Sequence, residues 1–258
     1  MKLSRRVSLG GDQLDKIDDS IVIRGIDTGA ANESISAVSR MGGSGQRVTG
    51  SHWNTLDVSV SYAIDIPKKQ LALRREVFEK VNAWARKAGW LRVNFMENRR
   101  MYVDKVIYPS AGDLRDWTDE YTITFRAYNV PFWQEETPTT YTSGTTAKGS
   151  TSMTVNGHVQ TVVNATFTNK SGVSFNNLTI KAGSSEIKLS GLGLGGSEKL
   201  TVTHGNDGLL KITKGSTSVY SKMSGADDLY VNPGKNTIAF EADRAGIWTF
   251  ESYGRYIG

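Results

Sequence analysis

The chain has no cysteine among its 258 residues, only three histidines and only five prolines. The absence of cysteine excludes disulfide bonds, zinc–thiolate sites and cysteine nucleophiles, so the fold must be held by packing and hydrogen bonds. The sequence also lacks any apolar run near the ~20 residues that a membrane-spanning helix requires. Its basic start, MKLSRRVSL, meets the polar stretch GGDQLDKIDD, so we expect neither a signal peptide nor a membrane anchor.

Residues that could carry catalysis or bind a metal are scarce and scattered. His52, His158 and His204 lie in separate loop-like stretches without metal-ligand spacing, so we expect ordinary surface or turn residues. The acidic run at residues 11–19 lacks the register of a calcium loop and favours a solvated turn. The sequence therefore predicts no catalytic residue, no metal ligand and no cofactor site. A hydrolase would need two converging carboxylates, and no spacing selects such a pair.

Two glycine clusters could be mistaken for phosphate-binding loops. GLGLGG at residues 191–196 formally matches G-x-G-x-x-G, but the following SEKLTVTHG predicts a strand where a dinucleotide site needs a helix. MGGSGQRVTG at residues 41–50 lacks the Lys-Ser/Thr pair of a P-loop. We therefore interpret the first cluster as a flexible turn and the second as part of a movable arm.

The formal net charge of +5 is dispersed, with both signs interleaved along the chain. A nucleic-acid-binding surface usually shows clustered Lys and Arg. The pattern therefore favours a solvated surface over a dedicated nucleic-acid site.

Composition changes sharply near residues 134–150, where QEETPTTYTSGTTAKGS replaces periodic apolar residues with Thr, Ser, Gly and Pro. Five of the six tryptophans precede this stretch, and all arginines except Arg244 and Arg255 also precede it. A stretch of this composition is typical of a linker. We predict two domains, residues 1–137 and residues 138–258.

The first half mixes strand patterns with one helix pattern and predicts an α+β unit with an antiparallel sheet. Pro67 precedes an amphipathic helix whose apolar residues recur at steps of three and four, and Gly89 ends it. The helix face is formed by Leu73, Val77, Val81, Trp84 and Ala88. The predicted strands are residues 20–26, 56–64, 90–95, 101–107 and 121–130, with ENRR at the tip of a hairpin.

Residues 27–53 form a long connection without a strand pattern that we recognise. Connections of this length in compact domains are usually functional or disordered. We expect this segment to be an irregular loop that can reach a neighbouring molecule.

The second half consists of short alternating segments separated by Gly, Asn, Asp and Ser, which predicts a β-sandwich. VNPGKNTIAF, residues 231–240, is predicted to be strand, tight turn and strand, because Pro233 and Gly234 suit a type II turn. A second turn is expected at residues 243–246. The apolar residues expected to face one core around these turns are Ile238, Phe240, Ala242, Trp248 and Phe250.

The order of these segments resembles the distal tail protein family, called Dit, of long-tailed phages and prophages. The likeness extends over essentially the whole chain. The segments that carry it are LDVSVSYAI (56–64), REVFEKVNAWARKAG (75–89), ENRR (97–100), YTITFRAYNVPFW (121–133) and LYVNPGKNTIAF (229–240).

The resemblance implies a mainly β fold, with an N-terminal tail-tube-like domain and a C-terminal galectin-like β-sandwich. It also implies a structural protein of the virion, made in the bacterial cytoplasm, that forms a ring, usually a hexamer. Such a ring joins the tail tube protein to tail-tip or receptor-binding proteins, and DNA passes through it only transiently. The long inserted carbohydrate-binding modules of some members are absent here.

Three residues of the long loop are our candidates for the subunit interface. Arg40, Met41 and Arg47 are proposed because Arg and Met are enriched at protein interfaces. The alternative from another functional class is a carbohydrate-binding adhesin or accessory module that uses the C-terminal sandwich. It requires an aromatic platform, for which Tyr220, Tyr230, Tyr253 and Tyr256 are the available residues.

Overall fold

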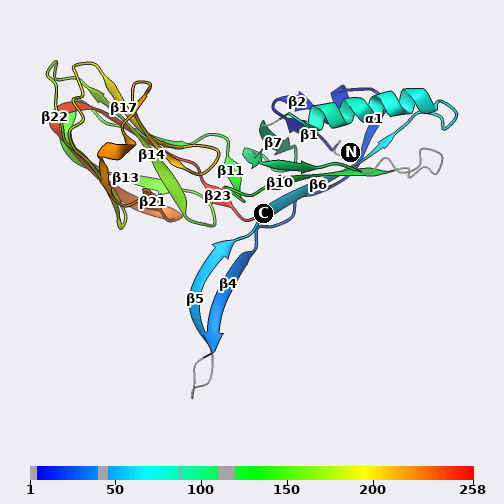
Figure 1. Ribbon diagram of the computed structural model, residues 1–258, viewed down its shortest axis with the longest axis horizontal. Coiled ribbons are helices and arrows are strands. Elements are labelled where there is room, and N and C mark those ends of the chain that lie inside the picture. Colours follow the sequence, from blue (N-terminus) through cyan, green and yellow to red (C-terminus); the bar gives the residue numbers. More distant parts are fainter. Residues whose placement is uncertain (1–4, 40–45, 88, 110–119) are drawn as a thin grey trace. The chain divides into compact units, whose positions relative to one another are not determined.

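The computed structural model describes residues 5–39, 46–87, 89–109 and 120–258 (Figure 1). The chain divides into two compact units, Met1–Trp133 with Ile257–Gly258, and Gln134–Tyr256. The sequence placed the boundary a few residues later, between 137 and 138, and assigned the last two residues to the second domain. Ile257 lies in the first unit, where its carbonyl accepts a hydrogen bond from the backbone N–H of Ala31 at 2.9 Å.

The first unit contains two antiparallel sheets, a separate two-stranded hairpin and one α-helix. The sheet with the order β3-β6-β10-β9 carries the helix, and β2, β1, β7 and β8 are neighbours in the other. The elements are β1 (Val7–Leu9), β2 (Asp12–Gln13), η1 (Leu14–Lys16), β3 (Ile21–Asp27), β4 (Glu33–Ser39), β5 (Gln46–Trp53), β6 (Leu56–Ile64), α1 (Leu71–Ala85), β7 (Gly89–Val93), β8 (Arg99–Val103), β9 (Lys105–Ile107), β10 (Tyr121–Ala127) and β11 (Trp133–Glu135).

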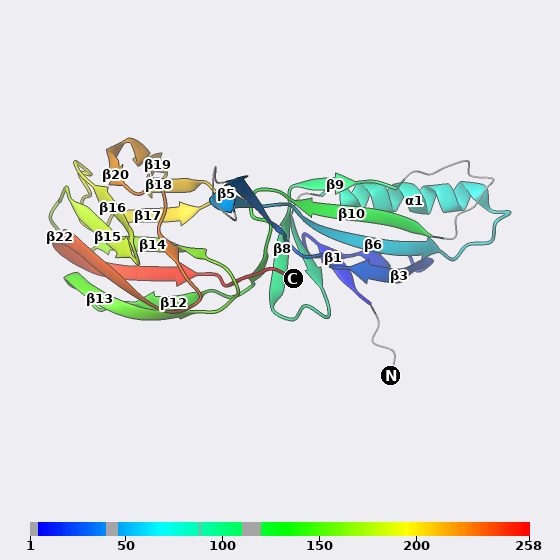
Figure 2. The same cartoon turned by 90° about the horizontal axis from the view of Figure 1, so that it is seen from below.

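Helix α1 lies along one face of the sheet formed by β6 and β10 (Figure 2). Ring contacts connect the two layers: Phe78 meets Tyr121 with centroids 5.0 Å apart, and Trp84 meets Phe125 at 5.8 Å. The predicted apolar face is correct at Val77, Val81 and Trp84, which are buried. It is wrong at Leu73, which is 45% exposed. Ala88 lies outside the described residues.

The opposite face of this sheet is polar and pairs its own side chains. Ser59 and Thr124 share a hydrogen bond between their hydroxyls at 2.9 Å, as do Ser61 and Thr122. These residues are direct cross-strand partners in the β6–β10 register. Alternation of apolar residues with Ser and Thr over residues 58–62 and 121–125 therefore separates a packed face from a hydrophilic one.

Tyr62 in β6 gives a testable consequence of this packing. Its side chain is fully buried, and its hydroxyl has no hydrogen-bond partner among the described residues. Burial raises the pKa of this phenol. Since an unpaired buried hydroxyl costs roughly 1–3 kcal/mol, we expect Tyr62→Phe to stabilise the protein by about 1 kcal/mol in urea unfolding. Tyr108→Phe, at an exposed ring, should leave the midpoint unchanged, and a destabilised Tyr62→Phe would contradict the expectation.

Eleven strands of the second unit form one antiparallel sheet that curls around its own core, and the short last strand, Arg255–Tyr256, lies outside that sheet. The short strands predicted for this half are found except at β22, where two predicted strands form one strand of 19 residues. The two packed layers are continuous with each other. The elements are β12 (Thr139–Thr142), β13 (Thr146–Val155), β14 (Thr161–Asn169), β15 (Leu178–Ala182), β16 (Ser185–Leu189), β17 (Lys199–His204), β18 (Leu210–Lys214), β19 (Thr217–Ser218), η2 (Tyr220–Lys222), β20 (Met223–Gly225), β21 (Tyr230–Val231), β22 (Gly234–Ser252) and β23 (Arg255–Tyr256).

Strand β22 joins the two layers because it belongs to both. Its first part pairs with β13 and β15, and its last part, residues 246–252, pairs with β12 and β14. The turn predicted at residues 243–246 is therefore wrong, since the strand continues through it. Gly246 makes this passage possible, because a Cβ there would collide with the Phe167 ring and the Thr168 carbonyl. The predicted core residues of β22 are all buried as expected.

The chain bends at Asn232 to Gly234, where a turn was predicted, but the predicted hairpin does not form. Gly234 has φ +98°, as the third position of a type II turn requires. The Asn236 amide donates to the carbonyls of Asn232 at 2.7 Å and Gly234 at 2.9 Å. However, β21 pairs with β14, while β22 begins opposite β13. The turn therefore changes the partner strand instead of folding the chain back on itself.

Candidate functional site: an exposed hairpin arm

The long connection of the first unit is a β-hairpin, which we call the arm, formed by β4 (Glu33–Ser39) and β5 (Gln46–Trp53). The irregular loop predicted for residues 27–53 is therefore wrong. The arm extends away from the two sheets of its unit (Figure 1). One extra residue in β5 shifts the register between Ser36 and Ala37. A two-stranded hairpin alone is marginally stable in water, so an arm of this kind needs a surface to pack on.

The arm exposes its largest apolar side chains to solvent. Ile35 is 61% exposed, Val48 is 60% exposed and Val38 is 59% exposed. Ile35 and Ala37 alternate along one side of β4, and Val48 is the direct partner of Ala37. One face of the arm thus carries a continuous apolar stripe. Clustered exposed apolar side chains of this kind mark interaction sites.

The base of the arm is held by backbone and side-chain contacts within the first unit. The Asn54 backbone N–H donates to the Asn32 carbonyl at 2.8 Å, and its amide donates to the Ser34 hydroxyl at 2.8 Å. The indole of Trp53 meets the ring of Phe132 edge-on, with centroids 5.3 Å apart. The root of the arm is therefore fixed on the sheets.

An open groove of about 630 Å³ lies beside this root. Its wall includes Trp53, Tyr128 and Asp57. Asp57 accepts two hydrogen bonds from Arg126, at 2.6 Å and 2.5 Å. These hydrogen bonds raise the pKa of the Arg126 guanidinium. The bidentate pair fixes one wall of the groove with little net charge.

Of the three predicted interface residues, the structure describes only the backbone of one, Arg47. Arg40 and Met41 lie outside the described residues. Arg47 lies in β5 opposite Val38, and its side chain is outside the described part of the structure. Their contribution to an interface stays a prediction.

The sequence reasoning missed the apolar stripe. Only a weak signal was present: Ile35 and Ala37 alternate with Ser34 and Ser36, and Val38 interrupts the alternation. The Ser and Gly content of residues 27–53 suggested a loop and concealed it.

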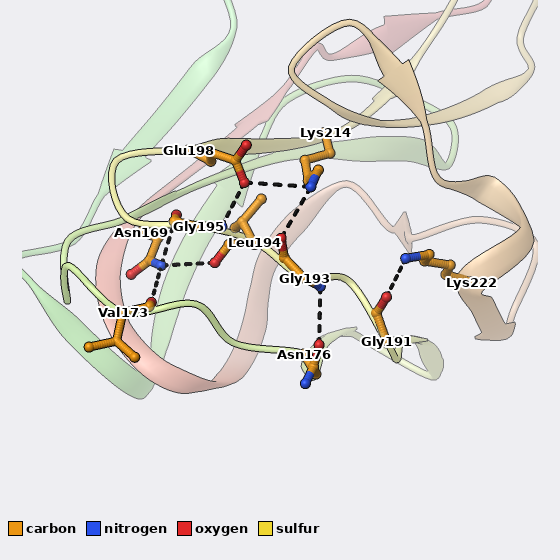
Figure 3. Close-up of polar contacts among 10 residues, drawn as sticks. All are labelled: Asn169, Val173, Asn176, Gly191, Gly193, Leu194, Gly195, Glu198, Lys214 and Lys222. Carbon is orange, nitrogen blue, oxygen red and sulfur yellow. Dashed lines mark hydrogen bonds and ion pairs between the residues drawn. The ribbon is translucent and has the colours of Figure 1, made fainter.

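The glycine-rich loop at residues 191–196 is an ordered part of the second unit (Figure 3). The loop is held in place by hydrogen bonds from Asn169, which is fully buried at the end of β14. The single amide nitrogen of Asn169 donates to three carbonyls, those of Val173 at 2.8 Å, Leu194 at 3.1 Å and Gly195 at 3.0 Å. The strand predicted after the loop is confirmed as β17 (Lys199–His204). The loop therefore connects strands, as the absence of a following helix indicated.

Charged side chains bind three further polar groups of this loop (Figure 3). Lys222 donates to the Gly191 carbonyl, and Lys214 donates to the Gly193 carbonyl at 3.1 Å. Glu198 accepts the Gly195 backbone N–H at 2.6 Å. Asn176 Oδ1 accepts the Gly193 backbone N–H at 3.1 Å. A phosphate-binding loop offers its backbone N–H groups to the ligand, whereas here side chains outside the loop accept two of them.

His204 is buried, contrary to the surface or turn position predicted for it. Its side chain is 5% exposed, and Nε2 lies 2.7 Å from Asp228 Oδ1. Its Nδ1 lies 3.0 Å from Asn164 Oδ1, which also accepts the His204 backbone N–H. The other oxygen of Asp228 accepts the Tyr230 hydroxyl at 2.6 Å. Among the described residues, no cluster of His, Asp and Glu has the arrangement of a metal site.

This histidine should make stability depend on pH. Burial lowers the pKa of His204 below its ordinary 6.5, although the hydrogen bond to Asp228 opposes the effect. A lowered folded-state pKa gives stability that is complete above pH 6.5 and is lost as the pH falls through the folded-state pKa. We therefore compare the free energies of unfolding of the wild type and His204→Gln in urea. The difference between them should fall by about 1 kcal/mol between pH 7.5 and pH 5.5. A pH profile of His204→Gln identical to that of the wild type would contradict the assignment.

Comparison with solved structures identifies the architecture. The chain aligns with the Dit protein (gp 19.1) of phage SPP1 with a TM-score of 0.66, over 96% of this chain and 98% of that one, at 12% sequence identity. This chain has the Dit fold. The mainly β fold class predicted from the sequence is thereby confirmed. The SPP1 protein is described as a paradigm of the hub adsorption apparatus in phages that infect Gram-positive bacteria.

Two structures of the phage p2 baseplate in its activated conformation, with Sr and with Ca, also align with the Dit fold of this chain. Their TM-scores are 0.46 and 0.45 at 8% identity, with 95% and 96% of this chain and 97% and 98% of theirs covered. Neither a protein-family model nor a curated protein sequence matches this chain. In the described residues, no helix combines the length and apolar character needed to cross a membrane.

Proposed function

We propose that this chain is a structural protein of the tail tip of a long-tailed phage or prophage. Copies form a closed ring, with six as the expected number, between the tail tube and the tail-tip or receptor-binding proteins. Its role is to join neighbours through shape-matched surfaces, without catalysis. DNA passes through the ring with weak, transient contact.

The observation that carries this proposal is the Dit fold over both units of the chain, with 96% of this chain and 98% of the SPP1 protein aligned. A shared fold alone does not determine function, so the surface must also suit the role. A ring subunit needs an element that reaches its neighbour, and the arm is an anchored hairpin with an unpartnered apolar stripe. We assign the arm to contact between adjacent subunits.

The hydrophilic sheet face of the first unit suits contact with passing DNA. Its hydroxyl groups are paired with each other, and its Arg126 is neutralised by Asp57. Strong DNA binding depends on free cationic side chains that displace counterions. We therefore expect only weak affinity for duplex DNA, and a tight, salt-sensitive affinity would contradict the proposal.

The carbohydrate-binding alternative has less support. A sugar platform needs aromatic faces that are free at one surface. Of the four tyrosines considered for it, Tyr220 and Tyr230 are exposed, at 44% and 38%. The hydroxyls of Tyr230 and Tyr256 are bound within the chain, to Asp228 at 2.6 Å and Glu135 at 3.0 Å. The open groove of about 580 Å³ in the second unit is lined by Lys, Glu, Ser and Thr, and its single ring belongs to Phe240, which is 5% exposed.

Negative-stain electron microscopy of the purified chain tests the proposal. We expect annular particles of uniform size, with sedimentation that gives one closed oligomer. A chain that remains monomeric at high concentration and binds glycans on an array would reject the ring and favour the carbohydrate-binding alternative. An annulus with no glycan binding supports the tail-tip role.

A further inference from the structure

Strand β13 (Thr146–Val155) is an unusually long free edge of the curled sheet in the second unit. Its ten residues pair with β22 along one side, and no described strand pairs with the other side. The other strands at the margins of this sheet are short: β19 has two residues, β20 has three and β12 has four. Figure 2 shows β13 along the margin of its unit.

A free edge presents a row of backbone N–H and C=O groups that can pair with another chain. Proteins usually protect such edges by shortness, charge, proline or bulges. Here the only charged residue of the strand is Lys148, close to its beginning, and the only irregularity lies between Thr146 and Lys148. Residues 149–155 carry none of these protections. The other edge strands of the same unit are protected because they are short.

We propose that β13 pairs antiparallel with β13 of a second copy of this chain, which extends the sheet across a two-fold axis. The occupant must be an extended strand, because only a backbone offers donors and acceptors at the spacing of the edge. A second copy is favoured because the strand is complementary to itself. This contact is distinct from the arm contact and does not depend on it.

The self-complementarity is clearest with the two-fold axis at Thr151. Lys148 then lies opposite Thr154, and Ser150 lies opposite Ser152, so no like charges meet. Thr–Thr and Ser–Ser pairs across strands are favourable. Burial alternates along the strand, with Ser150, Ser152 and Thr154 outward and Thr151 and Met153 inward. The added strand therefore continues both the polar outer face and the apolar inner face.

A charge exchange on the outer face tests the pairing without disturbing the fold. Ser150→Lys with Ser152→Lys places lysines opposite lysines across the axis, and Ser150→Glu with Ser152→Glu places carboxylates together. Both pairs of positions are exposed. We expect each variant alone to self-associate at least tenfold more weakly than its parent in sedimentation, and an equal mixture of the two to associate again. Thr217→Lys with Ser218→Lys, on the exposed margin β19, is the matched control and should associate like the parent.

These measurements use the full-length chain with Ile35→Lys and Val48→Lys in the arm as the parent, so that ring contacts are removed. This background separates the two hypotheses, because a failed ring leaves the β13 pair measurable. Since the chain has no cysteine, a mixture of Ser150→Cys and Ser152→Cys proteins should form mixed disulfide dimers under air oxidation, in preference to a Thr217→Cys control. A parent that stays monomeric, or lysine and glutamate variants that do not recover on mixing, would overturn self-pairing.

Discussion

Replacing Ile35 and Val48 with lysine should abolish ring formation while the protein remains folded. Both side chains are about three-fifths exposed in the single chain, so their replacement leaves the core untouched. In the ring, two unpaired ammonium groups would be placed in an apolar contact, at a cost of several kcal/mol. We expect at least a 100-fold weaker subunit association, measured by sedimentation and by the loss of annular particles in negative stain.

The control for this prediction places the same charges on the other face of the arm. Ser36→Lys with His52→Lys adds lysines at exposed positions of the same two strands, on the side away from the apolar stripe. This variant should still form annular particles. If both double variants assemble normally, the arm is not the subunit contact. If both fail equally, charge on the arm matters and the stripe does not.

The sequence was most informative where side-chain alternation and burial agree. The pattern of LDVSVSYAI predicted a strand at residues 56–64, and β6 has these bounds because one face packs on α1 while the other forms hydroxyl pairs. The helix was expected within residues 68–89 and spans Leu71–Ala85. Leu73 was misassigned because periodicity defines a face only to within one residue on either side.

The sequence was least informative where partner strands decide the structure. Residues 243–246, Asp-Arg-Ala-Gly, have the composition of a turn, yet β22 continues through them because strands pair on both of its sides. The arm was missed for the opposite reason: β4 and β5 pair only with each other, so no buried face imposes a strong apolar alternation. Local composition does not encode either outcome.

The length of the connection at residues 27–53 indicated where the candidate site lies, but the sequence did not indicate which of its residues form the site. A 27-residue connection in a compact domain indicated a functional segment, and the arm lies there. The choice of Arg40, Met41 and Arg47 used interface statistics alone, whereas the exposed stripe of Ile35, Ala37 and Val48 needed the strand register. His204 was placed at the surface because its partners, Asn164 and Asp228, are far away in sequence and meet it only in the folded sheet.

Asn169→Ala should be the most destabilising single substitution considered for the second unit. The Asn169 amide supplies one donor group to three backbone carbonyls, and its Oδ1 accepts from the backbone N–H and the hydroxyl of Ser171, at 2.9 Å and 2.7 Å. Each buried polar group left without a partner costs roughly 1–3 kcal/mol. We therefore expect a loss of about 4 kcal/mol in urea unfolding, with increased hydrogen exchange concentrated in residues 191–196. Asn206→Ala, at an exposed turn, should change the midpoint little. A loss below about 1 kcal/mol for Asn169→Ala, the size of an ordinary substitution, would show that the loop holds its shape without this amide.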